Sequence, residues 1–554
     1  MLLKCAPWRD HLPRTLVVHQ ATGPETFPSS PPNAATRSAV VFSIGPRNRR
    51  LPDRSSERAS AVTAEHEKRR EEPMAAKIFA ENSVVTLEEF EHDTLRIAQV
   101  LREQGVGLGD RVVLKAGNSI SYVSVLFALM HLGASVVLVD QQEKQEATGS
   151  IIQRAGAKVV LVDADAQVPA YVEPVYLYEL LAAAPDLAAT ESRLSFDAWC
   201  DLDDSLIMWS SGSTGEPKGI AKNGGRFLKN LERNAHHMGH ESDDVLLPLL
   251  PFSHQYGLSM VLIAWLAQCS LVIAPYRRAD RALRMAGLSG VTVVDATPST
   301  YRSILTIIKQ NPALADSLGT VRMFCSGAAP LDQALTDLYV ERFGSPLLDS
   351  YGSTEAGNVS FATVENPVSC GQVMEGLRIR VVDDEEQEVA AGVVGELLIE
   401  TPDVMVGYLT DDGGIDPVDQ HVFRTGDLGY LDPAGNLFVL GRKFAVHRMG
   451  YTLYPELIER KAAAGGCSVR VIPLPDERRG SQLVFFVEDE QLREAGHWRQ
   501  ALCDLLPAYE QPNRVVVLEQ FPLNRNGKPD KRRMEALALA DGRARPEDAV
   551  PVPS

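Results

Sequence analysis

The chain has 554 residues, of which 45% are hydrophobic and 23% charged, which is typical of a globular protein with two or more domains and excludes fibrous proteins and small disulfide scaffolds. The formal net charge of −18 argues against general binding to nucleic acid. The seven cysteines contain no Cys-x-x-Cys pair, so we expect free thiols and a cytoplasmic protein. No apolar run reaches the roughly 20 residues needed to cross a bilayer, so no membrane span is expected.

The first 73 residues differ in composition from the rest of the chain. Pro, Ser and Arg accumulate there, and no apolar period is sustained. Such a composition buries too little apolar surface to offset the entropy cost of ordering. The acidic residues Glu65 and Glu67 argue against a transit peptide. We therefore predict a disordered, dispensable leader, with Met74 as the functional start.

Regular structure is predicted from Thr86 onward. Thr86-Leu-Glu-Glu89 forms a capping box that opens an amphipathic helix through Leu101. A second helix is expected from Ser119 to just before Gly133. Short Val-rich runs alternate with helical segments, at residues 111–116, 135–140, 158–163, 245–250, 270–276 and 291–295. This alternation predicts an α/β fold in which helices cover both faces of parallel sheets.

The pattern changes after about residue 370 to strand pairs joined by turns. Gly395–Glu400 predicts one strand, and residues 430–440 predict a hairpin whose turn is Asp432-Pro-Ala-Gly435. We therefore predict a large N-terminal α/β domain over residues 74–441 that includes this β-rich subdomain. A hinge is expected at residues 442–443, a small α+β domain at 444–541 and a tail at 542–554.

One decapeptide after an apolar strand has the composition of a phosphate-binding loop. Ser210-Ser-Gly-Ser-Thr-Gly-Glu-Pro-Lys-Gly219 follows the strand at residues 205–209. Its glycines allow backbone amides to approach an anion, its hydroxyls add donors, and Lys218 adds a positive charge. The residues that would contact phosphate are Ser210, Ser211, Gly212, Ser213, Thr214, Gly215 and Lys218. The alternative is a solvent-exposed Gly/Ser loop.

This decapeptide resembles the phosphate loop of the adenylate-forming superfamily, which includes acyl-CoA synthetases, stand-alone adenylation enzymes and luciferase. Further segments match that family in the same order along the chain, from residue 75 to residue 541. They are Pro251-Phe-Ser-His-Gln-Tyr-Gly257, Ser326-Gly-Ala-Ala-Pro330, Asp349-Ser-Tyr-Gly-Ser-Thr-Glu-Ala-Gly357, Arg424-Thr-Gly-Asp-Leu-Gly429, Leu440-Gly-Arg442 and Pro522-Leu-Asn-Arg-Asn-Gly-Lys528. Six ordered matches make a far stronger case than any one of them.

The resemblance implies a ligase that joins a carboxylic acid to the α-phosphate of ATP and then passes the acyl group to a thiol. Lys528, Thr354 and Glu355 are the implied catalytic residues, and Glu355 is the implied ligand of Mg²⁺. Tyr351 would stack on adenine, and Asp427 and Arg442 would bind the ribose. The remaining nucleotide contacts implied by the resemblance are Gly327, Ala328, Ala329, Gly352 and Ser353.

The same residues have simpler interpretations when taken alone. Glu355 could be an acid favoured at a helix start, and Asp427 could be a turn residue. Lys528 lies in a basic run that, by charge alone, predicts a solvated face.

The acyl pocket is implied at two segments of the chain. Its candidate residues are Phe252, Ser253, His254, Ser350 and Asn358. Peptide-synthetase domains that activate α-amino acids have Asp after the Phe of the first segment, whereas this chain has Ser253. The substitution argues against an ordinary α-amino acid and favours a simple or differently substituted small carboxylic acid. Ser350 and Asn358 in the implied pocket are compatible with a moderately polar acid.

Three functions follow from these observations. The first is an acyl-CoA synthetase of fatty-acid or secondary metabolism, with ATP, Mg²⁺ and CoA as its small molecules. The second is a stand-alone enzyme that loads an acyl carrier protein through its phosphopantetheine. The third is a nucleotide-binding module without turnover, against which the presence of Lys528 and Glu355 argues.

Overall fold

The computed structural model describes residues 76–211, 217–419, 421–442, 446–448, 451–476, 480–507, 509–524 and 528–541. The described residues from 76 to 541 belong to one compact unit. The predicted leader, the predicted tail and hinge residue Lys443 lie outside the described residues, and the domain boundaries stay predictions. Within the described part of the chain, no helix is long and apolar enough to cross a membrane.

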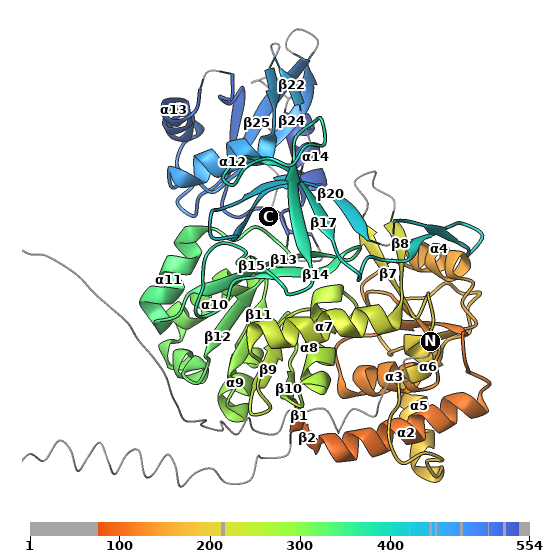
Figure 1. The fold of residues 1–554 in the computed structure, drawn as a ribbon. Coiled ribbons are helices and arrows are strands. Elements are labelled where there is room, and N and C mark those ends of the chain that lie inside the picture. Colours follow the sequence, from red (N-terminus) through yellow and green to blue (C-terminus); the bar gives the residue numbers. More distant parts are fainter. Residues whose placement is uncertain are drawn as a thin grey trace, which may run out of the picture. The chain divides into compact units, whose positions relative to one another are not determined.

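The first of the two large sheets has nine strands (Figure 1). Its strands β1, β9, β10, β11, β12 and β13 run parallel, and β2, β14 and β15 join antiparallel at the two ends. In sheet order the strands are β15 (Gln372–Val373), β14 (Gly357–Phe361), β13 (Leu347–Ser353), β12 (Met323–Ser326), β11 (Val293–Ala296), β9 (Val245–Pro248), β10 (Ser270–Ile273), β1 (Lys77–Ala80) and β2 (Ser83–Thr86).

A second, eight-stranded sheet contains the predicted strands at residues 111–116, 135–140 and 158–163. In sheet order its strands are β19 (Ile415–Pro417), β18 (Gly407–Leu409), β8 (Pro217–Lys222), β7 (Leu206–Ser211), β4 (Ser135–Leu138), β3 (Arg111–Lys115), β5 (Val159–Val162) and β6 (Val175–Tyr176). Strand β8 pairs antiparallel with β7, so the predicted phosphate loop closes a hairpin. The Val-rich pattern does not mark β8, because Pro217-Lys-Gly-Ile-Ala-Lys222 contains no valine.

Helices cover both faces of the two large sheets, as predicted. One core joins α2, α3, α7 and α8 to strands of both sheets, and a second packs α9, α10 and α11 on the other face of the nine-stranded sheet. A third packs α4 on the outer face of the eight-stranded sheet. The helices are α2 (Leu87–Glu103), α3 (Ile120–His131), α4 (Gln145–Ala155), α5 (Leu177–Ala183), η1 (Ala184–Asp186), α6 (Asp197–Cys200), α7 (Gly224–Met238), α8 (Gln255–Leu266), α9 (Ala279–Ser289), α10 (Pro298–Gln310), η2 (Pro312–Leu318) and α11 (Gln333–Phe343).

The C-terminal part of the described chain contains smaller sheets. An antiparallel sheet has the order β16 (Arg378–Val382), β17 (Gly395–Glu400), β20 (Val422–Leu431) and β21 (Leu437–Arg442). After it come β22 (Val446–Arg448), β23 (Tyr451–Leu453), α12 (Pro455–Ala464), β24 (Val469–Asp476), β25 (Gly480–Glu488), α13 (Ala495–Leu505), β26 (Arg514–Leu518) and α14 (Lys531–Asp541). The predicted fold class, a large α/β part followed by a small α+β part, is confirmed.

Local sequence signals place several of these elements correctly. Thr86 caps α2 through a hydrogen bond from the Glu89 amide to Thr86 Oγ1 (3.1 Å), and Glu89 Oε2 accepts from the Thr86 amide (2.8 Å). At the predicted β20–β21 turn, the Gly435 amide donates to the carbonyl of Asp432 (3.0 Å). Both interactions are short-range, which is why the sequence alone predicts them.

Candidate active site

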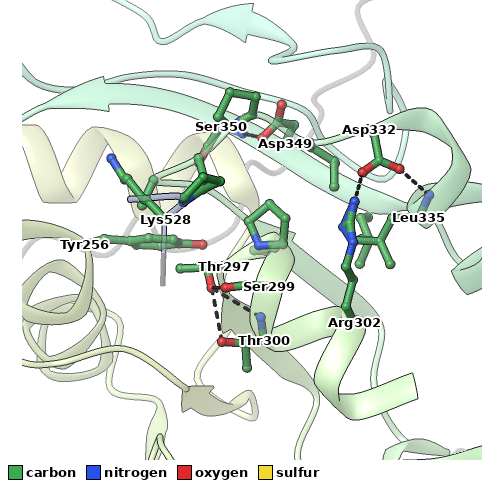
Figure 2. Close-up of a pocket in the computed structure, with 18 of the residues that line it drawn as sticks. Tyr256, Thr297, Ser299, Thr300, Arg302, Asp332, Leu335, Asp349, Ser350 and Lys528 are labelled. Carbon is green, nitrogen blue, oxygen red and sulfur yellow. Dashed lines mark hydrogen bonds and ion pairs between the residues drawn. The ribbon is translucent and has the colours of Figure 1, made fainter. Parts of the chain in front are cut away.

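A cleft of about 2850 Å³ lies along the carboxyl ends of the parallel strands of the nine-stranded sheet. Ligands of open α/β sheets bind at this edge, because loops rather than side-chain-filled strands form it. The lining includes Asp295, Cys325 and Ser350 from β11, β12 and β13, and also Asp427 and Lys528. Figure 2 shows part of this cleft, with Lys528, Tyr256 and Ser350 among its walls.

The turn between β13 and β14 carries Thr354 and Glu355, two of the predicted catalytic residues. The buried Lys222 of β8 donates to the Thr354 carbonyl (2.7 Å) and to Gln255 Oε1 (2.9 Å). Gln255 in turn donates through Nε2 to the Ser353 carbonyl (2.8 Å). The side chains of Lys222 and Gln255 therefore fix the turn through hydrogen bonds to its backbone oxygens.

Lys222 is an unusual residue for this position because its ammonium has almost no access to water. Burial lowers its pKa to about 8, while the negative charges of Glu355 and Asp403 favour the charged form. A buried ammonium is tolerated where it is hydrogen-bonded and paired with nearby carboxylates. Lys222 therefore does two things: its charge interacts favourably with the Glu355 carboxylate, and its hydrogen bond to Thr354 fixes the backbone of the turn.

Asp427, Tyr351, Arg442 and Lys528 form one cluster on the cleft wall. The Tyr351 hydroxyl donates to Asp427 Oδ2 (2.6 Å), and Arg442 Nε lies 3.1 Å from Asp427 Oδ1. Burial raises the pKa of Asp427, and Arg442, Tyr351 and Lys528 act in the opposite direction. Burial and the neighbouring Arg442 lower the pKa of Lys528. Four residues predicted from four separate motifs thus influence one another's charges.

The predicted phosphate loop is only partly described. Ser210 pairs with Lys218, and Ser211 with Pro217, at the end of the β7–β8 hairpin. Gly212, Ser213, Thr214 and Gly215 lie outside the described residues. The exposed Lys218 ammonium lies 5.1 Å from the ring centroid of Tyr408, and both residues line the cleft.

The loop after β12 lies against the predicted acyl pocket. A Cβ added at Gly327 would lie 2.6 Å from Ser350 Oγ and 3.0 Å from Tyr256 Cε1, so only glycine fits there without displacement. Ser350 Oγ donates to the Ser326 carbonyl (2.8 Å). Ala328 and Ala329 line the cleft, and Ala328 has a positive φ of 65°. Gly352 and Ser353 complete β13 and also line the cleft.

The predicted acyl-pocket residues separate into two groups. His254, Ser350 and Asn358 line the cleft, whereas Phe252 and Ser253 are not among its lining residues. Phe252 is buried against Tyr122, with ring centroids 6.1 Å apart. Ser253 Oγ lies 3.3 Å from Asp140 Oδ2, which also lies 3.4 Å from His254 Nε2. Asp140, which follows the end of β4, therefore positions Ser253 and His254, just before α8.

Sequence reasoning missed Lys222, Gln255, Tyr256 and Asp295. The Tyr256 hydroxyl donates to Asp295 Oδ1 (2.9 Å), and both residues line the cleft. A usable signal existed for Asp295, because a carboxylate interrupts the apolar run at residues 291–296 of a strand predicted to be buried on both faces. No comparable local signal marks Lys222, whose partners lie 33 and 132 positions away in the sequence.

Comparison with known proteins gives consistent results. The family model described as AMP-binding enzyme matches residues 64–409. A 2-succinylbenzoate–CoA ligase of Bacillus cereus is 26% identical over 482 residues, which cover 84% of this chain and 96% of the relative. The fatty acid–acyl-carrier-protein ligase ScoC of Streptomyces coeruleorubidus is 27% identical over 491 residues, or 82% and 92% of the two chains. The crystal structure of ATP-bound MatB from Rhodopseudomonas palustris shares the fold, with a TM-score of 0.75 at 24% identity over 86% and 98% of the two chains.

Proposed function

The chain belongs to the family of AMP-binding enzymes, and we propose that it is an ATP-dependent ligase that joins a small carboxylic acid to the thiol of CoA. The first step forms an acyl-adenylate and releases pyrophosphate. The second step transfers the acyl group from AMP to the thiol sulfur. The observation that supports this proposal most directly is the coupling of Lys528, Arg442, Asp427 and Tyr351 on the wall of one cleft.

We assign the first step to residues on both sides of this cleft. The carboxylate and ATP are both anions, so the site must offset their repulsion and align the attacking oxygen with the α-phosphorus. Lys528 would contact the carboxylate and the α-phosphate, where charge grows in the transition state. Thr354 would donate to the α-phosphate, and the loop from Ser210 to Lys218 would hold the β- and γ-phosphates.

The nucleoside would lie against the Asp427 cluster. Asp427 offers two oxygens to the ribose hydroxyls, and Arg442 keeps that carboxylate oriented. Tyr351 would stack on adenine while its hydroxyl donates to Asp427. Gly327, Ala328, Ala329, Gly352 and Ser353 would form the surrounding backbone surface.

Mg²⁺ fits the chemistry of this site through Glu355. A single carboxylate beside phosphate oxygens is the ligand set that Mg²⁺ prefers in nucleotide sites. The Met405 amide donates to the Glu355 carbonyl (2.7 Å), which fixes the backbone that carries this carboxylate. When bound, Mg²⁺ would neutralise part of the phosphate charge.

The withdrawal of Lys528 would separate the two steps. We propose that the small domain, residues 444–541, turns about a hinge at residues 442–443 after adenylation and so opens the path for the thiol. We also propose a cytoplasmic location. At described positions, Cys269, Cys325, Cys370, Cys467 and Cys503 are free thiols, as is usual in a reducing compartment.

A second candidate acceptor is an acyl carrier protein. The similarity to ScoC, a fatty acid–acyl-carrier-protein ligase, favours this alternative. The acyl-adenylate chemistry is the same for both acceptors, and only the thiol differs.

Pyrophosphate release separates the candidates. The protein is incubated with ATP, Mg²⁺ and a library of carboxylic acids, with and without CoA, and pyrophosphate and thioester are measured. The proposal predicts release and an acyl-CoA product. Release without acyl-CoA would favour the carrier protein, and the lack of release with every acid would favour a nucleotide-binding module without turnover.

A further inference from the structure

A buried carboxylate lies in the wall of the cleft and has no role in the adenylation chemistry. Asp295 is 3% exposed and stands in β11, in the parallel part of the nine-stranded sheet. Its register partners are Pro248 of β9 and Cys325 of β12. A charged side chain at such a position costs free energy unless a partner compensates it, and Val at the same position would cost nothing.

Only one of the two Asp295 oxygens has a partner among the described residues. Oδ1 accepts from the Tyr256 hydroxyl, whereas Oδ2 is buried and accepts no hydrogen bond. Burial raises the pKa of Asp295 to about 6, and His240 acts in the opposite direction. The carboxylate is therefore still charged at neutral pH, but only one of its two oxygens accepts a hydrogen bond.

Further buried polar atoms without partners belong to residues that line the same cleft. Asn234 Nδ2 of α7 and Ser259 Oγ of α8 have no hydrogen-bond partner within the described chain, and both residues line the cleft. Ser259 lies one helical turn after Tyr256, and α7 packs on α8. We call Asn234, Tyr256, Ser259 and Asp295 the polar floor. A simple hydrocarbon chain would offer these polar atoms no hydrogen-bond partner, so the surface does not suit such a substrate.

Tyr256 connects the polar floor to the part of the cleft that contains Ser350 and Lys528. The ring edge of Tyr256 and the hydroxyl of Ser350 both lie against Gly327, and the Tyr256 hydroxyl donates to Asp295 Oδ1. Figure 2 shows Tyr256 and Ser350 in the part of the cleft that also contains Lys528. Lys528 and the polar floor thus line one cleft, and we infer that an acid whose carboxylate contacts Lys528 extends toward the polar floor.

From this geometry, and resting on the proposed function, we propose that the enzyme selects carboxylic acids that carry a protonated amino group away from the reacting carboxylate. The ammonium would donate to Asp295 Oδ2, and Ser259 Oγ would accept a second hydrogen bond. Charge-assisted hydrogen bonds of this kind are the strong ones, and a site built to make them discriminates against analogues that lack the donor.

The test uses sets of acids matched in shape. Each set holds an amino, a hydroxyl and a methyl form of one skeleton, such as 3-aminobutyrate, 3-hydroxybutyrate and 3-methylbutyrate. A longer set is 4-(aminomethyl)benzoate, 4-(hydroxymethyl)benzoate and 4-ethylbenzoate. We expect kcat/KM for pyrophosphate release to favour the amino form over the methyl form by about 10²-fold or more in the set that fits.

Variants of Asp295 assign the preference to its carboxylate. Asp295→Asn should reduce the amino preference at least about tenfold, and Asp295→Val should favour the methyl form. Asp243→Asn removes an exposed carboxylate just before β9 and should leave the preference unchanged. Because the wild-type comparison needs no variant, a misfolded variant leaves the test intact.

Each outcome decides between the two proposals. Equal use of amino and methyl forms, a preference for the hydroxyl form, or an equal loss for all acids in Asp295→Asn overturns this inference and leaves the proposed function standing. The lack of pyrophosphate release with every acid overturns both.

Discussion

At the scale of single residues, Lys528 is the sharpest test of the assigned chemistry. Lys528→Ala should lower the adenylation rate by about 10²-fold or more, the effect of losing one charge contact in the transition state. Pyrophosphate release under saturating ATP measures this loss.

The matched control for Lys528 lies in the same basic run. Arg532→Ala removes an exposed positive charge four residues further on and should leave the rate within about twofold. Circular dichroism should show both variants folded. A Lys528→Ala rate close to that of the wild type would refute the central assignment.

Asp295 should also leave a signature in the pH dependence of stability. Its folded pKa of about 6 lies above its ordinary value of 3.8, so between these values the folded state binds the proton more tightly than the unfolded state. The stability contributed by this residue therefore falls as pH rises from about 4 to about 6, and the full cost is present above that. His240 and Tyr256, which face the carboxylate, are present in wild type and variant alike.

Asp295→Asn removes this titration. The unfolding free energy of the variant relative to wild type should rise by about 3 kcal/mol over that pH window, since one pKa unit corresponds to about 1.4 kcal/mol. Urea unfolding at a series of pH values measures the difference. A difference that stays constant with pH would mean that Asp295 has an ordinary pKa.

At the scale of elements, the turn between β13 and β14 depends on support from β8 and α8. Lys222→Met keeps the shape of the side chain but leaves the Thr354 carbonyl without its donor. We expect adenylation to fall about tenfold, through a weaker hold on ATP, while KM for the acid stays unchanged. Lys229→Met, an exposed change on α7, is the control. Equal increases in KM for ATP and acid would argue for a general packing role.

The start of α2 offers a stability test remote from the cleft. Thr86→Ala removes the side-chain acceptor of the Glu89 amide and should cost about 1 kcal/mol of unfolding free energy. Thr86→Ser keeps the hydroxyl and should cost much less. Adenylation should be unchanged in both variants, because no predicted site residue lies on this helix.

How far the sequence predicts the structure depends on the range of each interaction. The cap of α2 and the turn at Asp432 involve residues at most four apart, and the sequence predicts both. Ordered motifs also place Tyr351 and Asp427 in one site, although these residues are 76 positions apart. Pattern reasoning could not find Lys222, because its role arises only when β8 pairs with β7 and reaches the β13–β14 turn.

The acyl pocket shows the same limit. Of the pocket residues that the resemblance implies, His254, Ser350 and Asn358 line the cleft, whereas Phe252 and Ser253 do not, and the lining adds Tyr256 and Asp295. Tyr256 reaches the cleft because α8 begins at Gln255, and the first turn of this helix directs the Tyr256 side chain toward Asp295 of β11. The direction of a side chain at a helix start depends on tertiary packing, which a single sequence does not display.

At the scale of the whole molecule, the junction between the large and small parts is built around Gly441. Its φ of 132° favours glycine, and an added Cβ would collide with the Glu456 side chain of α12. Gly441→Ala should therefore disturb how α12 lies against β21. We expect the ratio of thioester formation to adenylation to change, which single-turnover assays of the two steps measure. Gly435→Ala, in the exposed β20–β21 turn, is the control for glycine loss.

The leader can be tested at the same scale. Residues 75–554 form one compact unit that contains all the predicted site residues. A chain shortened to residues 74–554 should retain adenylation within about twofold of the full chain. A larger loss, with the shortened chain folded, would assign a function to the first 73 residues.

The half-satisfied carboxylate of β11 has a consequence for how this enzyme would respond to selection. If Asp295 lowers stability in return for substrate choice, a screen for heat resistance that ignores activity should replace it with Val or another apolar residue. The survivors would fold more robustly and still adenylate acids, yet they would admit hydrocarbon analogues that the parent rejects. Thermostability and fidelity would then trade against each other at one strand position, and ancestral or consensus redesign of this chain should leave that position untouched.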